Sequence, residues 1–202
     1  MSSAFVVGAT GAVGSELVKL LSDSSKFSKV VLFARRSVDA ATGDKFVQKT
    51  VDFEKLEENS EDQVGADGFY KVDHDYVMNA AKLAKENGVK QFVLVSAGGA
   101  DDKSMFLYLK TKGQVEREIE ELNFDKFIVM HPGLIETKRP EFRLGEVVGS
   151  VFLKPLRFVS NRFSSSATEI AQAMITATQT EVTGKHIWDN VKIVQEAKKY
   201  SA

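Results

Sequence analysis

The chain has 202 residues, which is enough for one domain with a buried core. Its hydrophobic content of 43%, charged content of 27% and net charge of −1 are typical of a globular protein, and they exclude an overall field that would recruit nucleic acid. The absence of cysteine excludes disulfides, a thiolate nucleophile and a cysteine metal site. No run of about 18 apolar residues occurs and no targeting-peptide pattern is evident at the start, so neither a membrane span nor a removable leader is expected.

The first predicted strand, residues 4–7, leads into a turn with three glycines, Gly8, Gly11 and Gly14, and then into a helical pattern. This order is typical of a nucleotide pyrophosphate site, because glycine lets the backbone approach the ligand and a helix N-terminus offers free N–H groups. The spacing is G-x-x-G-x-x-G rather than the usual G-x-G-x-x-G. A glycine turn without a ligand is the alternative, but the strand–turn–helix context favours a nucleotide.

Arg35 and Arg36 directly follow the second predicted strand, residues 29–34. In a dinucleotide fold this position meets the adenosine ribose, where an acidic residue favours NAD and guanidinium groups suit a 2′-phosphate. We therefore expect NADP, the alternative being a solvated arginine pair. Asp52 follows the third predicted strand, residues 46–51, and either contacts the adenine amino group or is a turn residue.

Residues 54–68 contain no apolar strand, although a doubly wound nucleotide domain normally has one there. Two alternatives stay open: one central strand is absent from this fold, or the natural protein has residues that this sequence lacks. After this stretch a helix is predicted over residues 69–86, with Tyr70, Val77 and Ala81 on its apolar face, His74 on its exposed face and Gly88 after its end.

The remaining elements alternate along the chain. They are a strand at 91–95, a helix at 104–122, a strand at 126–130, a helix to about residue 177 with a capping box, Ser166 and Glu169, a short strand at 186–188 and a final helix. The pattern predicts an α/β, Rossmann-like doubly wound parallel sheet with helices on both faces, in a single domain over residues 1–202. Residues 145–163 mix apolar and basic side chains; they predict a helix beside the substrate cleft or, alternatively, a membrane-surface or partner-binding face.

Tyr108 and Lys112 are four residues apart in the predicted helix and therefore share one face. A nearby ammonium stabilises the phenolate and lowers the pKa of a tyrosine from its reference value near 10, which makes Tyr108 a usable acid or base. A surface tyrosine beside a lysine is the alternative. Ser96, at the end of the preceding strand, is a candidate to polarise a carbonyl group. The three histidines have no metal-ligand spacing, so no metal site is expected.

This combination resembles the atypical branch of the short-chain dehydrogenase/reductase superfamily, and within it the Tat-interacting-protein-type oxidoreductases and their fungal mitochondrial relatives. The similarity extends over residues 27–36, 51–56, 72–76, 106–116, 131–133 and 139–143. It implies a Rossmann-like fold, NADPH binding and a Ser–Tyr–Lys site. It also implies cofactor contacts at Gly8, Thr10, Gly11, Ala12, Val13, Arg35, Arg36, Tyr108, Lys112, Ile135 and Arg143, to which the residue patterns add Gly14 and Asp52.

The resulting expectation is an NADP-dependent oxidoreductase that moves a hydride between the nicotinamide and a small carbonyl or alcohol substrate of unknown identity. Ala97 stands where the superfamily usually has the second serine of a pair, which leaves the role of Ser96 open. The alternative is an NADPH-binding regulatory or scaffold protein with a protein partner and little turnover. Neither reading involves nucleic acid. The expected location is the cytoplasm, with peripheral contact at the mitochondrial outer membrane as the alternative.

Overall fold

The computed structural model describes residues 2–34, 37–39, 41–50, 70–136 and 164–201. The chain forms two compact units, one from Met1 to Val89 and the other from Lys90 to Ser201. The prediction of a single domain over residues 1–202 stays a prediction. None of the described helices is long and apolar enough to cross a membrane.

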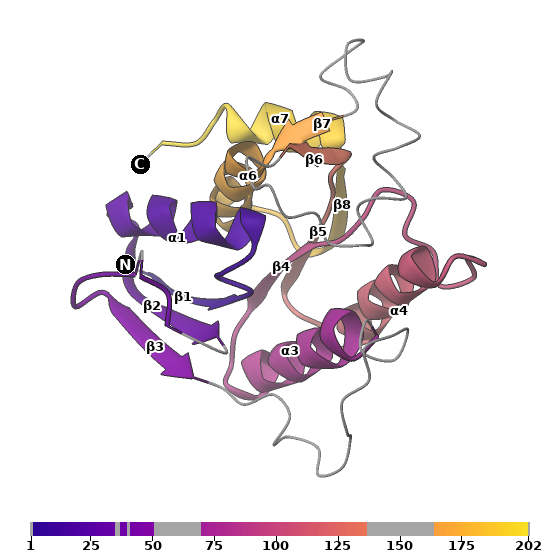
Figure 1. Cartoon of the computed structure of the whole chain (residues 1–202), viewed down its shortest axis with the longest axis horizontal. Coiled ribbons are helices and arrows are strands. Elements are labelled where there is room, and N and C mark those ends of the chain that lie inside the picture. Colours follow the sequence, from indigo (N-terminus) through magenta and orange to yellow (C-terminus); the bar gives the residue numbers. More distant parts are fainter. Residues whose placement is uncertain (1, 35–36, 40, 51–69, 137–163, 202) are drawn as a thin grey trace. The chain divides into compact units, whose positions relative to one another are not determined.

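The first unit is built on a three-stranded parallel sheet in the order β1 (Ser2–Val7), β2 (Phe27–Ala34), β3 (Phe46–Thr50). The central strand supplies the most buried side chains, Val30 and Leu32. Helix α1 (Ala12–Asp23) follows β1 and buries Leu17, Val18 and Leu21. Figure 1 shows α1 on one side of this sheet and α3 on the other. The glycine turn thus lies between a buried strand and a packed helix, as the sequence predicts.

The long helix of the first unit begins with a π-helical segment, η1 (Lys71–Asp75), and continues as α3 (Tyr76–Glu86). The prediction that His74 is exposed is wrong: His74 is buried, stacks on Tyr70 at 4.4 Å and lies 2.7 Å from the Asp75 carboxylate. A π turn contains an additional residue, so the buried face shifts by one position and follows His74, Met78 and Ala81. The helix ends before Gly88, which has a φ of +75°.

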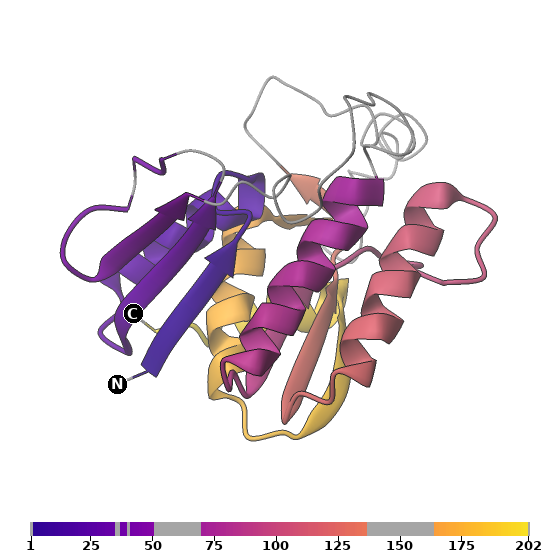
Figure 2. The same ribbon diagram turned by 90° about the horizontal axis from the view of Figure 1, so that it is seen from below.

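The second unit contains a parallel sheet in the order β4 (Gln91–Val95), β5 (Lys126–His131), β8 (Gly184–Asp189). Strand β5 is buried from Lys126 to Met130, as expected for a central parallel strand. A second pair of parallel strands, β6 (Leu134–Glu136) and β7 (Ser164–Ser166), is not predicted by the sequence because both strands are short and β7 consists of serines. Helices α4 (Leu107–Glu121) and α6 (Ala167–Gln179) lie on opposite sides of the larger sheet, and α7 (Asn190–Ala197) ends the unit (Figures 1 and 2).

Both ends of α6 are held by side chains. The predicted capping box is confirmed, since Ser166 Oγ accepts from the Glu169 amide at 3.1 Å and the Glu169 carboxylate accepts from the Ser166 amide at 2.8 Å. At the other end Lys126 Nζ donates to the carbonyl oxygens of Ala177, Thr178 and Thr180 at 2.7–3.1 Å. Burial lowers the pKa of Lys126.

The predicted alternation of parallel strands and helices is therefore confirmed over the described residues. The stretch without a fourth strand, residues 54–68, and the apolar, basic stretch at 145–163 both lie outside the described residues.

Candidate functional site

The glycine turn after β1 has the geometry that a phosphate-binding turn requires. Gly8 has a φ of +77°, and its carbonyl oxygen accepts a hydrogen bond from the Gly11 amide at 2.9 Å. A Cβ at Gly14 would lie 2.1 Å from the Gly8 carbonyl oxygen, so the close approach of α1 to the turn requires glycine at this position. A Cβ at Gly8 would meet nothing within 4 Å, which leaves open space beside the turn.

The N-terminus of α1 is electrostatically suited to an anion. Gly11 occupies the N-cap position with no side chain to accept from the first-turn amides, and the first turn carries no acidic residue. The amide groups of this turn and the positive end of the helix dipole therefore favour a phosphate ligand. The structure brings together six predicted cofactor residues in this one turn: Gly8, Thr10, Gly11, Ala12, Val13 and Gly14. These residues fit a dinucleotide pyrophosphate.

The other predicted cofactor residues do not belong to this turn. Arg35, Arg36, Asp52 and Arg143 lie outside the described residues. Ile135 lies in the second unit on β6, where it is half-buried and paired with Ser165 of β7. Their assignment to the cofactor stays a prediction.

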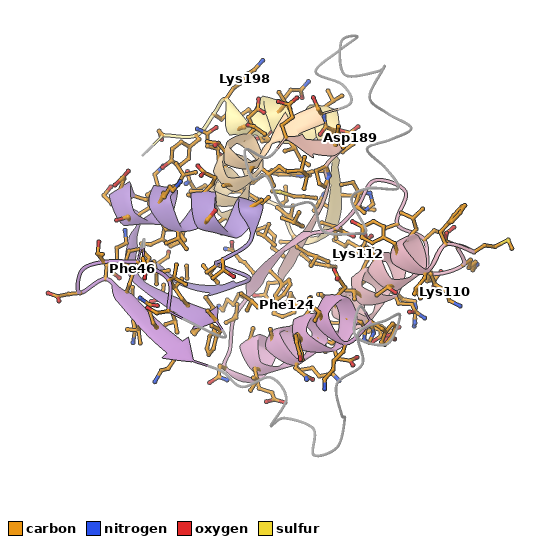
Figure 3. All side chains as sticks on the ribbon, in the orientation of Figure 1. Phe46, Lys110, Lys112, Phe124, Asp189 and Lys198 are labelled. Carbon is orange, nitrogen blue, oxygen red and sulfur yellow. The ribbon has the colours of Figure 1, made fainter. Side chains whose placement is uncertain are left out.

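Tyr108 and Lys112 lie in the first turns of α4, in the second unit. Lys112 Nζ is 5.8 Å from the centroid of the Tyr108 ring, and 43% of Tyr108 is exposed. Lys110 projects from the other side of the helix (Figure 3), as expected for residues two positions apart. The ammonium of Lys112 is thus near the one accessible phenol of this helix, an arrangement that can stabilise a developing phenolate.

The position of α4 depends on a close backbone contact at Gly113. A Cβ at Gly113 would lie 2.2 Å from the Asp102 amide nitrogen, so only glycine lets the preceding loop approach the helix this closely. The same loop is fixed by a hydrogen bond from the Asp101 amide to the Leu109 carbonyl at 3.1 Å and by an ion pair between Asp102 and Arg117 at 3.1 Å. These contacts hold the turn that carries Tyr108.

Ser96 is buried at the end of β4, and its hydroxyl donates to the carboxylate of Glu116 on α4. The same carboxylate oxygen, Oε1, is 2.8 Å from Nε2 of His131, the last residue of β5. Because the hydroxyl proton of Ser96 is used in this bond, donation to a substrate carbonyl would require the hydroxyl to rotate. The prediction that Ser96 polarises a carbonyl stays a prediction.

Glu116 is the residue of this site that the sequence analysis misses. A signal was present, because Tyr108, Lys112 and Glu116 recur every four residues along one side of the helix. A glutamate in a helix rich in charged residues is ordinarily solvated, however, and only the fold shows that this one is buried. Among the described residues, no cluster of three or more His, Asp or Glu is arranged to hold a metal.

The comparison with protein families matches residues 8–181 to the family described as NAD(P)H-binding. Protein HTATIP2 from Rattus norvegicus is 40% identical over 172 residues, which cover 76% of this chain and 71% of that protein. The mitochondrial protein FMP52 from Debaryomyces hansenii is 38% identical over 157 residues, which cover 68% of each chain.

Solved structures with low sequence identity share the fold. A short-chain dehydrogenase from Streptomyces avermitilis has a TM-score of 0.64 at 17% identity, covering 98% of this chain and 92% of that one. UDP-glucuronic acid 4-epimerase from Bacillus cereus, solved in complex with NAD, has a TM-score of 0.63 at 13% identity, covering 98% and 91% of the two chains. The predicted Rossmann-like α/β class is confirmed by these similarities.

Proposed function

The chain belongs to the NAD(P)H-binding, atypical short-chain dehydrogenase/reductase family of HTATIP2 and FMP52, and from this membership we propose that it is an NADPH-dependent oxidoreductase. When bound, the cofactor supplies the hydride that is exchanged with a carbonyl or alcohol carbon. The observation that carries this proposal is the accessible Tyr108 phenol with the Lys112 ammonium 5.8 Å from its ring centroid.

The first task of the chain is to hold the cofactor. The amide groups between Gly8 and Gly14 bind the pyrophosphate, supported by the N-terminal dipole of α1. Arg35 and Arg36 bind the 2′-phosphate that distinguishes NADPH from NADH. Asp52 meets the adenine, and Ile135 and Arg143 complete the cofactor contacts.

The second task is to manage the proton that accompanies hydride transfer. In the reductive direction Tyr108 Oη gives its proton to the developing alkoxide, and Lys112 stabilises the phenolate that remains. Lys112 also orients the cofactor through the ribose hydroxyls. Ser96, once its hydroxyl rotates away from Glu116, donates a hydrogen bond to the substrate oxygen.

Removal of single groups on α4 tests the proton-transfer step. Tyr108→Phe removes only the hydroxyl and should lower kcat by about 10²–10⁴-fold, the usual contribution of a general acid, while the Kd for NADPH should change far less than kcat. Lys112→Met should also lower kcat. Lys110→Met is the matched control, because Lys110 lies on the other side of the same helix, and it should behave as the unaltered protein. Turnover of a carbonyl panel that does not depend on Tyr108 would contradict the assignment.

Cofactor choice has a separate test. The double change Arg35→Ala and Arg36→Ala should weaken NADPH binding by about 1–3 kcal/mol, since charge-assisted hydrogen bonds to the 2′-phosphate are lost. NADH has no such phosphate and serves as the internal control. Equal weakening of both nucleotides, measured by calorimetry, would refute the assignment of the two arginines.

A second candidate function is an NADPH-binding scaffold or regulatory protein. It is favoured by the hydrogen bond that uses the Ser96 proton and by Ala97 beside it. It is also favoured by the exposure of two apolar side chains shortly before Tyr108, Met105 at 100% and Phe106 at 73%. Tight NADPH binding without Tyr108-dependent turnover would support this candidate. We propose that the protein is located in the cytoplasm. The fungal relatives are named mitochondrial, so peripheral contact at the mitochondrial outer membrane is the alternative location.

A further inference from the structure

The hydroxyl of Ser96 on β4 is oriented by the carboxylate of Glu116 on α4, to which it donates. Both residues are buried, and each is only 5% exposed. We propose that Glu116 is a positioning residue that sets substrate specificity: because it takes the Ser96 proton, Ser96 Oγ acts as a hydrogen-bond acceptor and the site recognises the hydroxyl of an alcohol in preference to a carbonyl group. This inference rests on the proposed function, in which Ser96 meets the substrate oxygen.

The direction of the hydrogen bond follows from the chemistry of its partners. A carboxylate has only acceptor sites, whereas a hydroxyl has one proton and two lone pairs. Ser96 therefore donates its one proton to Glu116 Oε1. His131 Nε2, which is 2.8 Å from the same oxygen, donates the second proton. What Ser96 Oγ still offers to a ligand is its lone pairs.

The position of Ser96 is fixed by its backbone as well as by its side chain. The Ser96 amide donates to the Met130 carbonyl oxygen at 2.9 Å, at the end of the paired strands β4 and β5. Ser96, Glu116 and His131 thus form one hydrogen-bonded network that joins β4, α4 and β5 within the second unit. Groups that are held in place before binding lose little conformational freedom when a ligand arrives.

Glu116 acts through Ser96 rather than on the substrate itself. It lies on the same side of α4 as Tyr108 and Lys112, but two helical turns, about 12 Å along the axis, after Tyr108. Tyr108 is 43% exposed, whereas Glu116 is buried. The phenol is therefore the group of this helix that a substrate reaches, and the carboxylate determines what Ser96 presents.

An alcohol and a ketone make different demands on Tyr108 and Ser96. The phenol can donate to the oxygen of either ligand. An alcohol then donates its own proton to Ser96 Oγ and leaves the bond to Glu116 intact. A ketone has no proton to donate, so its oxygen either faces the lone pairs of Ser96 or requires Ser96 to give up a strong, charge-assisted hydrogen bond. The alcohol is therefore the better-bound member of the redox pair.

The test compares cyclohexanol with cyclohexanone, which differ only in this group. Calorimetry measures both Kd values on protein saturated with tetrahydro-NADP, an analogue of the cofactor that cannot transfer a hydride. We expect cyclohexanol to bind about tenfold more tightly, the least that a hydrogen bond to a charged group contributes. Glu116→Gln keeps the shape of the side chain, but its amide can donate to Ser96 and free the serine proton for the ketone. The preference for the alcohol should then fall about tenfold.

Two further variants separate this role from a purely structural one. Glu120→Gln is the matched control, since Glu120 is an exposed residue one turn later in α4, and it should leave the preference unchanged. Ser96→Ala removes the group through which Glu116 acts, so the two Kd values should become nearly equal. Adding Glu116→Gln to Ser96→Ala should then have no further effect on the preference. Ser96→Ala also tests the proposal if Glu116→Gln does not fold, which thermal unfolding checks.

The outcomes that overturn the inference are distinct from failure of the proposed function. Equal Kd values of the two probes in the unaltered protein overturn the inference. A preference that survives Ser96→Ala, or a parallel change of both Kd values in Glu116→Gln, overturns it as well. If tetrahydro-NADP does not bind, or if the loaded protein binds neither probe, the proposed function itself has failed and the inference fails with it.

Discussion

At the scale of single residues, a buried carboxylate connects the two strand ends beside α4. Glu116 accepts from Ser96 of β4 and is 2.8 Å from His131 of β5 through one oxygen. A buried carboxylate is costly unless it is hydrogen-bonded, and buried donors that lose their acceptor are costly as well. Glu116 therefore helps to keep α4, and with it Tyr108, in place on the sheet.

Glu116→Ala should lower the free energy of unfolding by about 2–4 kcal/mol, because the buried Ser96 hydroxyl and the half-buried His131 ring lose their common partner. Glu120→Ala is the matched control in the same helix: Glu120 is exposed and pairs with Lys185 at 2.7 Å, and such surface pairs contribute about 0–1 kcal/mol. Urea denaturation of both variants measures the difference. Equal effects of the two substitutions would contradict a structural role of the buried network.

The sequence identifies some site residues and misses others for a physical reason. Gly8, Gly14, Tyr108 and Lys112 form local patterns, and local spacing is readable from sequence. The contacts of Glu116 join residues that are 15 or more positions apart and depend on the fold. The sequence places His74 on the wrong face of its helix because a π turn leaves no recognisable sequence pattern.

At the scale of secondary-structure elements, α7 illustrates how charge stabilises a helix of only eight residues. Glu196 is buried on α7 and lies 2.7 Å from both Lys192 Nζ and Lys199 Nζ. Burial by itself raises the pKa of Glu196, but hydrogen bonds from the two lysines outweigh this effect and the net pKa is lowered from 4.5. The ionised carboxylate therefore stabilises the folded chain.

The pH dependence follows from that direction. A lowered pKa in the folded state means that the stabilisation is present above pH 4.5 and is lost as the pH falls through the lowered value. Glu196→Gln should cost about 1–2 kcal/mol at pH 7, and the difference from the unaltered protein should shrink below pH 4.5. Chemical denaturation across this pH range measures it, with exposed Glu181→Gln as the control. A difference that stays constant with pH would contradict the account.

The sequence predicts most elements because their hydrophobic periods are strong. The buried strands β2 and β5 and the capped helix α6 are found close to their observed bounds. Strands β6 and β7 are missed because three residues carry too little periodicity, and the serines of β7 do not resemble a strand. Their pairing is fixed by the fold, in part through Asn190, which bonds Gly133 and Ser164.

At the scale of the whole molecule, cofactor binding raises the free energy of unfolding, so the two quantities can be measured together. A ligand that binds only the folded chain stabilises it by about 2.7 kcal/mol when its concentration is 100 times its Kd. The net charge of −1 provides no long-range attraction for an anionic dinucleotide, so binding depends on local groups at the glycine turn. An increase in the unfolding temperature with added nucleotide is thus expected to report binding at the glycine turn rather than a general attraction of anions.

Calorimetry of the intact, folded protein with NADPH and with NADH tests the central claim most directly. The account predicts a saturable heat of binding and a higher unfolding temperature with both nucleotides, because the pyrophosphate binds at the N-terminus of α1. It also predicts that NADPH binds more tightly than NADH, because the 2′-phosphate adds its own contacts. No heat and no thermal stabilisation at saturating concentrations of either nucleotide would contradict both the oxidoreductase and the scaffold.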